Sequence, residues 1–356
     1  MMLCARICGL ALLALAIGCG PNTDTSSGSA QTTRIVLVTD WKAQAEHGGF
    51  YEALAEGLYA KHGLRVTIRE GGAAVNVGQL LAGGAADFGI ASNSFIPLNL
   101  RREGGEFKAV MAAFQKDPQV LITHPRNDIK SIADMAGKPI MIGDAATATF
   151  WPWLKAKFGF SDSQIRKYTF NLAPFLVDKT AIQEGYLSSE PYAIEKQGGV
   201  KPQVFPLADA GYPGYANMVL VPDSWITSKP EAVQAFVDAT IEGWSDYLYG
   251  DPSPGNALIK KDNPEMTDDL IAQAIDKMRE YGIALSGDAE TLGIGAMSDA
   301  RWQAFFSTMA DGGVYPRDFN YRNAYTLQFI NKGHGMDRLA AFKSGSRPRD
   351  INTTRQ

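Results

Sequence analysis

The segment from Arg34 to Ser94 constrains the fold more than any other part of the chain, because apolar runs and helix-like stretches alternate in it. The runs 34–40, 64–70 and 86–92 are short, apolar or β-branched and bounded by polar residues or glycine, which is typical of buried strands. Between them, 47–61 and 74–82 contain helix formers and stop at glycines. This order predicts a β-α-β-α-β unit, and therefore an α/β fold with a largely parallel sheet.

Polar and aromatic side chains follow each of these predicted strands. Asp40 and Trp41 follow the first strand, Glu70 with two glycines the second, and Ser92, Asn93 and Ser94 the third. Ligands of open α/β sheets bind beyond the carboxyl ends of the strands. The sequence therefore predicts a ligand site in its first third.

The rest of the chain predicts a second, smaller α/β domain and a helical layer. Two apolar runs, 107–115 and 119–124, precede Pro125, where we expect the first crossover between domains. The expected elements of the second domain are helices at 129–138, 149–158, 174–184 and 191–197 and strands at 139–143, 168–172 and 203–207. The strand 217–222 returns the chain, and amphipathic helices at 230–249, 266–281 and 298–309 cover the first domain.

These patterns predict a type II arrangement of two α/β domains joined by a two-crossover hinge. The expected boundaries are a signal peptide at 1–19, a flexible tether at 20–33, domain I at 34–122 and 215–343, domain II at 123–214, and a loose tail at 344–356. The crossovers fall near 122–126 and 214–218, and closure around a ligand is the expected motion.

The leader predicts export. A single Arg6 precedes twelve apolar residues, Ile7 to Gly18, which span only about 18 Å as a helix and cannot cross a bilayer. The sequence from Leu15 to Cys19 resembles a bacterial lipobox, although Ile17 stands where alanine or serine is usual. We expect lipidation at Cys19, with ordinary signal cleavage nearby as the alternative.

Composition narrows the classes of function. All three cysteines lie in the leader, so the body has no disulfide and no thiolate site, and a net charge of −4 argues against nucleic-acid binding. The histidines His47, His62, His124 and His334 show no metal-binding spacing, the glycine pairs lack a dinucleotide pattern, and there is no nucleophile elbow. The sequence therefore predicts no metal site, no cofactor and no enzymatic activity.

Several motifs together resemble a known family. They are Asp40-Trp41 closing the first strand, a histidine about six residues later, GFYEA (49–53), GLY (57–59), GLRVTI (63–68) and GAADFG (84–89). This set is similar to the periplasmic solute-binding proteins of ABC importers in the sulfonate/thiamine-pyrimidine superfamily, and most of all to those for formylaminopyrimidine-type thiamine precursors. The resemblance implies an extracytoplasmic, monomeric binding protein that works with an ABC permease and its ATPase.

The same resemblance raises one enzymatic alternative, since the eukaryotic thiamine-pyrimidine synthases share this fold. Those enzymes use a lysine and a histidine just after the third strand and a cysteine-rich segment near the second crossover. Here Ala91 and Phe95 stand at the first two positions, and 211–221 contains no cysteine. The resemblance therefore implies binding without catalysis.

Candidate binding residues come from both predicted domains, and each has a structural alternative. Asp40 could pair with a ring amine or cap a helix, Trp41 could stack on the ligand or pack at the rim, and His47 could be buried. From the second domain, Thr149 and Trp151 could offer a donor and a ring, or be a cap and a core residue. The predicted ligand-binding set is Asp40, Trp41, His47, Ser92, Asn93, Ser94, Gln115, Thr149, Trp151, Glu190, Tyr212 and Tyr215.

This set predicts the chemical class of the ligand. It contains aromatic rings, amides, hydroxyls and carboxylates but no arginine, and an anion site would need arginine or clustered N–H donors. A flat, neutral or weakly cationic heterocycle such as an aminopyrimidine fits better, with riboflavin, sulfonate or taurine, and nitrate as alternatives.

Overall fold

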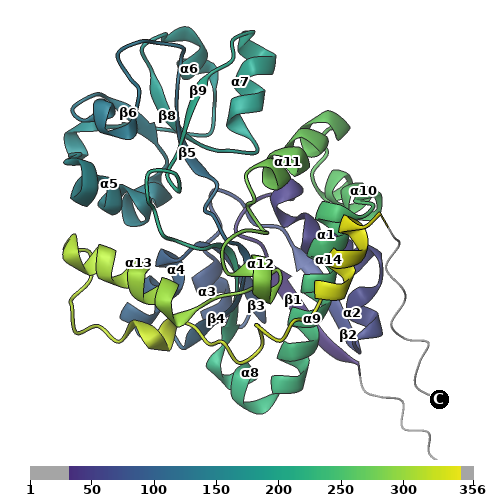
Figure 1. Cartoon of the computed structure of the whole chain (residues 1–356). Coiled ribbons are helices and arrows are strands. Elements are labelled where there is room, and N and C mark those ends of the chain that lie inside the picture. The colour runs from purple at the N-terminus through teal and green to yellow at the C-terminus, as the bar shows by residue number, and fades with distance from the viewer. Residues whose placement is uncertain (1–31, 346–356) are drawn as a thin grey trace, which may run out of the picture. The chain divides into compact units, whose positions relative to one another are not determined.

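Residues 32–345 are described by a computed structural model, and two five-stranded sheets dominate this part of the chain (Figure 1). The first sheet has the order β2-β1-β3-β10-β4 and the second the order β7-β6-β8-β5-β9. In the first, β1–β2 and β1–β3 are parallel, whereas β10 runs antiparallel to both its neighbours. The second sheet repeats this pattern, with β5 as its antiparallel strand. The predicted α/β class with two domains is confirmed.

The ten strands of the two sheets can be compared with those that the sequence predicted. The first sheet consists of β1 (Thr33–Val38), β2 (Leu64–Arg69), β3 (Phe88–Asn93), β4 (Phe107–Phe114) and β10 (Ala216–Pro222). The second sheet consists of β5 (Gln119–Thr123), β6 (Ile140–Ile142), β7 (Ile165–Lys167), β8 (Ile182–Tyr186) and β9 (Gln203–Pro206). All the strands of the first sheet were predicted to within a few residues, because its apolar runs have clear ends.

The chain passes between the sheets twice, and the first passage lies earlier than predicted. β5 pairs with β8 and β9, so it belongs to the second sheet, and the crossovers are 115–118 and 207–215. The expected crossover at 122–126, and with it the boundary between 122 and 123, is wrong. β5 ends at Thr123, shortly before Pro125, but the chain has already changed sheets at the turn that contains Asp117 and Pro118.

Helices cover both sheets. Around the first sheet lie η1 (Ala45–His47), α1 (Gly48–Ala55), α2 (Leu58–Lys61), α3 (Val77–Ala82), α4 (Phe95–Arg102), α8 (Asp223–Ser228), α9 (Pro230–Tyr249), α10 (Ser253–Asp262), α11 (Asp268–Glu280), α12 (Ala289–Leu292), α13 (Asp299–Asp311), η5 (Tyr321–Ala324) and α14 (Met336–Lys343). Around the second lie η2 (Ile132–Met135), η3 (Asp144–Ala148), α5 (Phe150–Phe158), η4 (Asp162–Gln164), α6 (Ala173–Val177) and α7 (Glu190–Gly198). We call each sheet with its helices a lobe.

The long helix α9 packs on α1 at the centre of the first lobe. A Cβ atom at Gly49 would lie 2.2 Å from the ring of Trp244, a fully buried side chain of α9. Only glycine allows this close approach. The predicted helix at 230–249 is confirmed, and its apolar stripe, including Phe236 and Trp244, is core.

Predictions for the second lobe were less accurate. The expected helix at 174–184 ends at Val177, and the chain then forms β8, while 168–172 is not a strand and Ile129–Lys138 contains only a 3-10 turn. β8 carries the polar residues Gln183 and Glu184, which are buried. Their polar character hides the strand pattern, because the sheet rather than local preference holds this segment.

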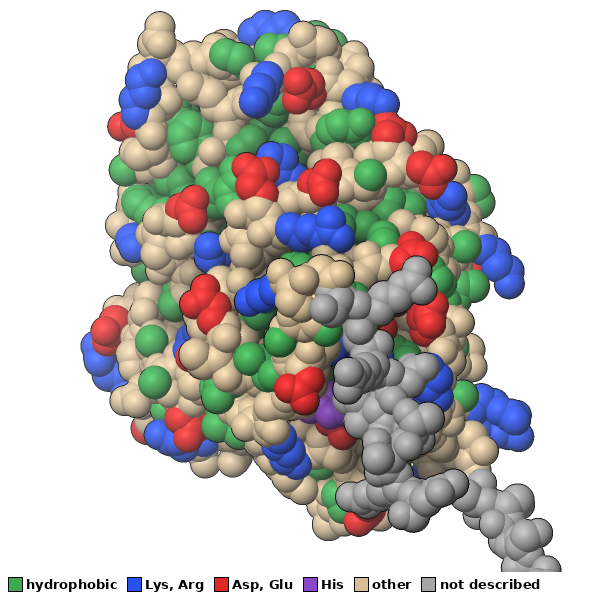
Figure 2. All heavy atoms as spheres, turned by 45° about the vertical axis from the view of Figure 1, so that its right-hand side comes forward, with side chains coloured by type: hydrophobic (Ala, Val, Ile, Leu, Met, Phe, Trp, Pro, Cys, Tyr) green, Lys and Arg blue, Asp and Glu red, His purple; other side chains and the backbone are tan. Residues whose placement is uncertain are grey.

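Charges of both signs are interspersed on the face of the molecule in Figure 2. Within residues 32–345, no helix has the length and apolar character needed to span a bilayer. The expected signal peptide, the lipidation site Cys19, nearly all of the tether and most of the tail lie outside the described residues. Of the expected tether, Thr33 already begins β1.

Candidate functional site

A cavity of about 600 Å³ lies between the two lobes, a volume typical of small-molecule sites. Segments that follow β1 and β3 line it from the first lobe, and β8 and the start of α7 line it from the second. This is the edge at which the sequence placed the ligand. The first crossover also contributes, through Asp117.

The charged groups that line the cavity are almost all acidic. The lining includes the carboxyl groups of Asp40, Glu46, Glu103, Asp117, Glu184 and Glu190. Among the described residues that line it, none is lysine or arginine, and the one histidine is His47. Lys42 and Lys116, which flank lining residues in sequence, point elsewhere and bond to Glu265 and to the Tyr281 carbonyl. The cavity therefore favours ligands that donate hydrogen bonds or carry positive charge.

On the first lobe, the turn η1 brings an acid and a histidine to the cavity. His47 Nε2 lies 3.0 Å from Asp40 Oδ1, and His47 Nδ1 has no hydrogen-bond partner among the described residues. Glu46 is buried, and burial raises its pKa above the ordinary value. Its carboxylate accepts a hydrogen bond from Ser188 of the second lobe, so this contact joins the lobes.

On the second lobe, two glutamates are each fixed by a backbone donor. Gly143 N–H donates to Glu184 Oε1 at 2.7 Å, and Tyr186 N–H donates to Glu190 Oε2 at 2.7 Å. Burial, opposed by these hydrogen bonds, raises the pKa of Glu184 to about 8 and that of Glu190 to about 6. At neutral pH this lobe therefore offers both a protonated carboxyl group and a carboxylate.

A further acid of the cavity, Asp117, lies at the first crossover. It is 4% exposed, and its Oδ1 accepts a hydrogen bond from the backbone N–H of Gln119 at 2.9 Å. Burial raises its pKa to about 7. A charge change at this position would be felt both by a ligand and by the segment that links the lobes.

Aromatic rings approach the cavity from both lobes. Trp41 meets Phe170 with ring centroids 4.6 Å apart, and Phe170 in turn lies 5.1 Å from Tyr168. Phe170 is 45% exposed and adopts a positive φ of 61°, which is unusual for a bulky residue. Phe150 also lines the cavity, at the start of α5. A planar ligand in the cavity would therefore have aromatic rings of both lobes to stack against.

The structure brings most of the predicted site residues to the cavity. The lining includes Asp40, Trp41, His47, Ser92, Asn93, Thr149 and Glu190. Of these, Asn93 also accepts a hydrogen bond from Phe95 N–H at 3.1 Å, as an Asx turn would require, and Thr149 donates to the Ala145 carbonyl at 3.1 Å.

Trp151 was predicted as a stacking face, and that prediction is wrong. It is 1% exposed, its Nε1 donates to Asp162 at 3.0 Å, and its ring packs against Phe160. The helix α5 begins at Phe150, so Phe150 faces the cavity and the next side chain turns into the core. The predicted stretch lines the cavity, but through Phe150 and not through Trp151.

Four other predicted residues lie outside the lining and stabilise the crossovers instead. Tyr215 N–H donates to Ser94 Oγ at 2.9 Å, and Tyr215 OH donates to Asp288 at 2.9 Å. Gln115 donates to the Ala296 carbonyl at 2.8 Å, and Tyr212 is buried among Phe95, Trp153 and Phe305. Position near a crossover is therefore not sufficient for access to the ligand.

Arg301 of α13 connects both crossovers. Its guanidinium donates to the carbonyls of Gln115 in the first and of Pro213 and Gly214 in the second, at 3.1 Å for each of the latter two. It also stacks over the ring of Tyr215 at 4.1 Å. These contacts join α13 to both passages between the lobes.

Three buried acids of the cavity, Glu46, Asp117 and Glu184, were not among the predicted site residues. Glu46 immediately precedes His47, which was predicted to bind the ligand, but it lies just before the predicted helix at 47–61 and no pattern singled it out. Glu184 was hidden because its strand was predicted as a helix, and Asp117 falls between the apolar runs 107–115 and 119–124, where no binding residue was predicted. Recognising β8 would have placed Glu184 inside a buried strand, where a carboxylate is unusual.

Comparisons with known proteins show the family of this chain. A model of the family described as NMT1/THI5 like matches residues 44–253. The formylaminopyrimidine-binding protein of Halalkalibacterium halodurans is 24% identical over 298 residues, which cover 79% of this chain and 88% of that protein.

Solved structures show the same fold. The periplasmic aliphatic sulphonate binding protein SsuA from Escherichia coli has a TM-score of 0.63 at 14% identity, covering 82% of this chain and 92% of that one. The alkanesulfonate-binding protein SsuA from Xanthomonas axonopodis pv. citri, bound to MOPS, has a TM-score of 0.59 at 13% identity, covering 82% and 98%.

Proposed function

We propose, from the premise that this chain belongs to the NMT1/THI5-like family, that it is the solute-binding protein of an ABC importer and captures a small planar heterocycle. The first candidate is a thiamine pyrimidine precursor such as formylaminopyrimidine. The relative named for that ligand supports the choice, and the sulfonate-binding neighbours support the binding-protein fold. The observation that carries the proposal is a cavity lined by carboxyl groups without lysine or arginine.

An aminopyrimidine edge matches these acids. Its amino group donates hydrogen bonds and its ring nitrogen accepts one, so a carboxylate and a protonated carboxyl group are both suitable partners. Glu184 and Glu190, with pKa values of about 8 and about 6, supply one of each near neutral pH. The aromatic rings of Trp41, Phe150 and Phe170 supply faces against which a flat ring can stack.

The lining argues against anionic ligands. A sulfonate or nitrate would meet several carboxyl groups and no guanidinium or ammonium, and like charges at short range oppose binding. Sulfonates therefore serve as the contrasting class in a binding test, although the fold is shared with sulfonate-binding proteins.

The synthase alternative has little support in the site. Phe95, which stands at the histidine position of those enzymes, is fully buried against Phe305, and Ala91 at the lysine position is fully buried in β3. We propose that the chain binds its ligand without converting it. Its partners are then an ABC permease and the ATPase of that permease, outside the cytoplasm, with a lipid on Cys19 as the anchor of a monomer.

Calorimetric titration of the purified protein with a panel of ligands tests the proposal. Formylaminopyrimidine and related aminopyrimidines should bind saturably with one site per chain, and taurine, alkanesulfonates and nitrate should not. Riboflavin tests whether a larger planar ring is accepted. Tight binding of a sulfonate, with no response to any pyrimidine, would contradict the proposal.

A matched pair of variants on α7 locates the binding. Glu190 lines the cavity, whereas Glu195 on the same helix is exposed and does not. Glu190→Gln should weaken pyrimidine binding at least tenfold, since a charge-assisted hydrogen bond contributes about 1.5–3 kcal/mol. Glu195→Gln should bind like the unaltered protein.

A further inference from the structure

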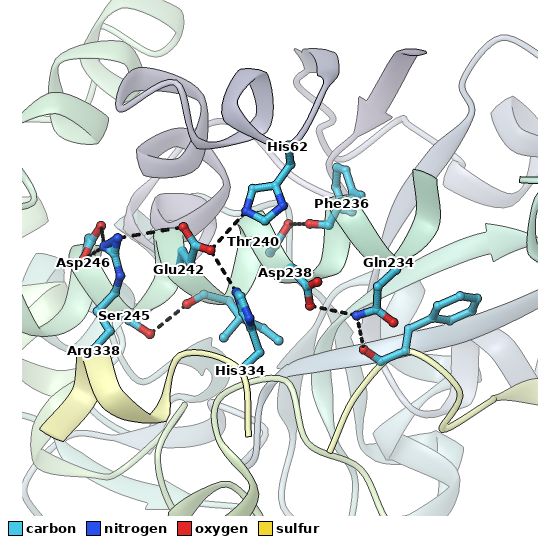
Figure 3. Close-up of polar contacts among 12 residues, drawn as sticks. His62, Gln234, Phe236, Asp238, Thr240, Glu242, Ser245, Asp246, His334 and Arg338 are labelled. Atoms are coloured by element: carbon cyan, nitrogen blue, oxygen red, sulfur yellow. Dashed lines mark hydrogen bonds and ion pairs between the residues drawn. The ribbon is translucent and has the colours of Figure 1, made fainter. Parts of the chain in front are cut away.

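Three side chains with metal-binding atoms meet on the first lobe, outside the cavity lining (Figure 3). They are His62, Glu242 and His334, and they come from segments that are far apart in the sequence. The sequence spacing predicts no metal site, because 180 residues separate the first pair and 92 the second. Only the fold brings them together.

The surrounding elements hold each residue in place. His62 ends α2, Glu242 lies in the middle of α9, and His334 sits between Gly333 and Gly335 just before α14. Both of these glycines have positive φ, 72° and 77°, which a residue with a side chain rarely adopts. The loop conformation that presents His334 to α9 therefore depends on its neighbours.

One turn earlier on α9, a second set of contacts fixes α2. The ring of Tyr59 stacks on Phe236 at 5.1 Å, and its hydroxyl lies 3.0 Å from Thr240 Oγ1. All of these groups are buried. The end of α2 is thus rigidly placed, and His62 projects from it toward Glu242.

The geometry is close to that of a metal centre. Nε2 of His62 and Nε2 of His334 lie 3.1 and 2.9 Å from the same atom, Glu242 Oε1. No two of the three ligand atoms are more than 4.8 Å apart. Zinc–ligand bonds of about 2.0–2.1 Å in a tetrahedral site put neighbouring ligand atoms about 3.3 Å apart. Small side-chain rotations would therefore suffice to place an ion among them.

The outer contacts orient the carboxylate without occupying the shared oxygen. Arg338 Nη2 lies 3.8 Å from Glu242 Oε2, on the side away from the histidines, while Arg338 Nη1 bonds both oxygens of Asp246 at 2.6 and 2.8 Å. Asp246 offsets the arginine charge, and Asp238 adds negative charge that acts on His334. Outer partners of this kind fix the direction of metal-binding carboxylates in known sites.

The three residues are also accessible. Their side chains are 27%, 17% and 32% exposed for His62, Glu242 and His334, so an ion can reach them and keep a water in a fourth position. Two imidazoles and one carboxylate form a donor set that suits Zn²⁺ and similar borderline ions, whereas Mg²⁺ and Ca²⁺ prefer oxygen ligands alone.

We propose that His62, Glu242 and His334 bind one divalent transition-metal ion, with Zn²⁺ as the first candidate, and that the ion connects α2 and the segment before α14 to α9. The inference is independent of the solute that the cavity captures. It assigns the site a structural role, which is to hold the C-terminal segment on the first lobe.

Zn²⁺ alone, added to the full chain after treatment with a chelator, tests the proposal. One ion per chain should bind saturably and raise the melting temperature, while Mg²⁺ should not. His62→Gln, Glu242→Gln and His334→Gln should each lower the Zn²⁺ affinity at least about tenfold. His47→Gln is the matched control, because His47 forms a histidine–carboxylate pair with Asp40 at the cavity, away from the proposed site, and it should leave Zn²⁺ binding unchanged.

A second measurement covers the case in which a variant fails to fold. In the unaltered protein, Zn²⁺ should protect His62 and His334 from diethyl pyrocarbonate, as mapped by mass spectrometry, and should leave the reactivity of the buried His47 unchanged. Loss of binding in His47→Gln would place the ion in the cavity and overturn the proposal. Absence of saturable Zn²⁺ binding, or equal affinity in all four variants, would overturn it as well.

Discussion

Trp41 and Trp151 differ in burial, and this difference decides what each ring can do. Trp41 lines the cavity and touches Phe170 across it, whereas Trp151 is enclosed by the core of the second lobe. Trp41→Ala should weaken the cognate heterocycle at least roughly tenfold and leave the ligand-free melting temperature nearly unchanged. Trp151→Ala should instead lower the free energy of unfolding by about 3–5 kcal/mol.

Paired titration calorimetry and denaturant unfolding of the two variants separate these outcomes. Normal binding by Trp41→Ala would show that the ring only packs at the rim. A Trp151→Ala protein of unaltered stability would contradict its position in the core.

The raised pKa of Glu184 makes the free energy of unfolding fall as pH rises. Its pKa is about 8 in the folded protein against an ordinary 4.5, so between these values the folded chain holds a proton that the unfolded chain has released. The stabilisation is complete below pH 4.5 and is lost as pH rises through about 8. Asp117 and Glu190, with raised values of about 7 and about 6, act in the same direction.

Urea unfolding of the ligand-free protein across this range is the measurement. The free energy of unfolding should fall as pH rises from about 5 to about 8. Glu184→Gln keeps an acceptor for Gly143 N–H but cannot titrate, so it should reduce the fall by on the order of 2 kcal/mol. Identical pH profiles for the two proteins would mean that Glu184 is ionised throughout.

Among the described helices, α13 is the one whose arginine, Arg301, donates hydrogen bonds to both crossovers. Arg301 reaches carbonyls of both, and lysine cannot reproduce its planar fork of donors. Arg301→Lys should lower the free energy of unfolding by about 1–3 kcal/mol, because buried carbonyl groups lose their donor.

Arg322→Lys is the control, since the Arg322 side chain is 57% exposed and its ion pair with Asp299 spans 3.7 Å. It should change the stability by less than about 1 kcal/mol. If urea unfolding shows equal effects of the two substitutions, the contacts of Arg301 with the crossovers do not stabilise the protein.

At the scale of the whole molecule, the two crossovers at 115–118 and 207–215 predict a hinge. Contacts such as Tyr192 OH to Asp269 at 2.9 Å already join the second lobe to α11 of the first. Ligand should favour the closed arrangement and reduce the radius of gyration in X-ray scattering from a chain that begins at residue 32. Superimposable curves with and without saturating ligand would argue against closure.

The leader carries the last prediction. If Cys19 is acylated, the mature protein should be found in the membrane fraction and incorporate labelled lipid. Cys19→Ser should then release it and abolish the labelling. Continued membrane association of that variant, with lipid still incorporated, would show that the lipobox was misidentified.

The sequence alone determined the first lobe and the position of its site. Apolar runs with clear ends predicted its strands, the stripe of α9 predicted its long helix, and strand-end residues such as Asp40, Trp41 and Asn93 do line the cavity. These features are local: each follows from the periodicity of a few neighbouring residues and from the rule that strand ends meet at one edge.

Only the tertiary structure decided the features that depend on distant partners. β5 looks like any apolar strand, and its sheet is set by pairing with β8 and β9. Whether Phe150 or Trp151 faces the cavity depends on where α5 begins, and the burial that raises the pKa of Glu184 depends on the packing around β8 in the folded second lobe. The meeting of His62, Glu242 and His334 likewise arises because α2, α9 and the segment before α14 pack together, which no spacing along the chain records.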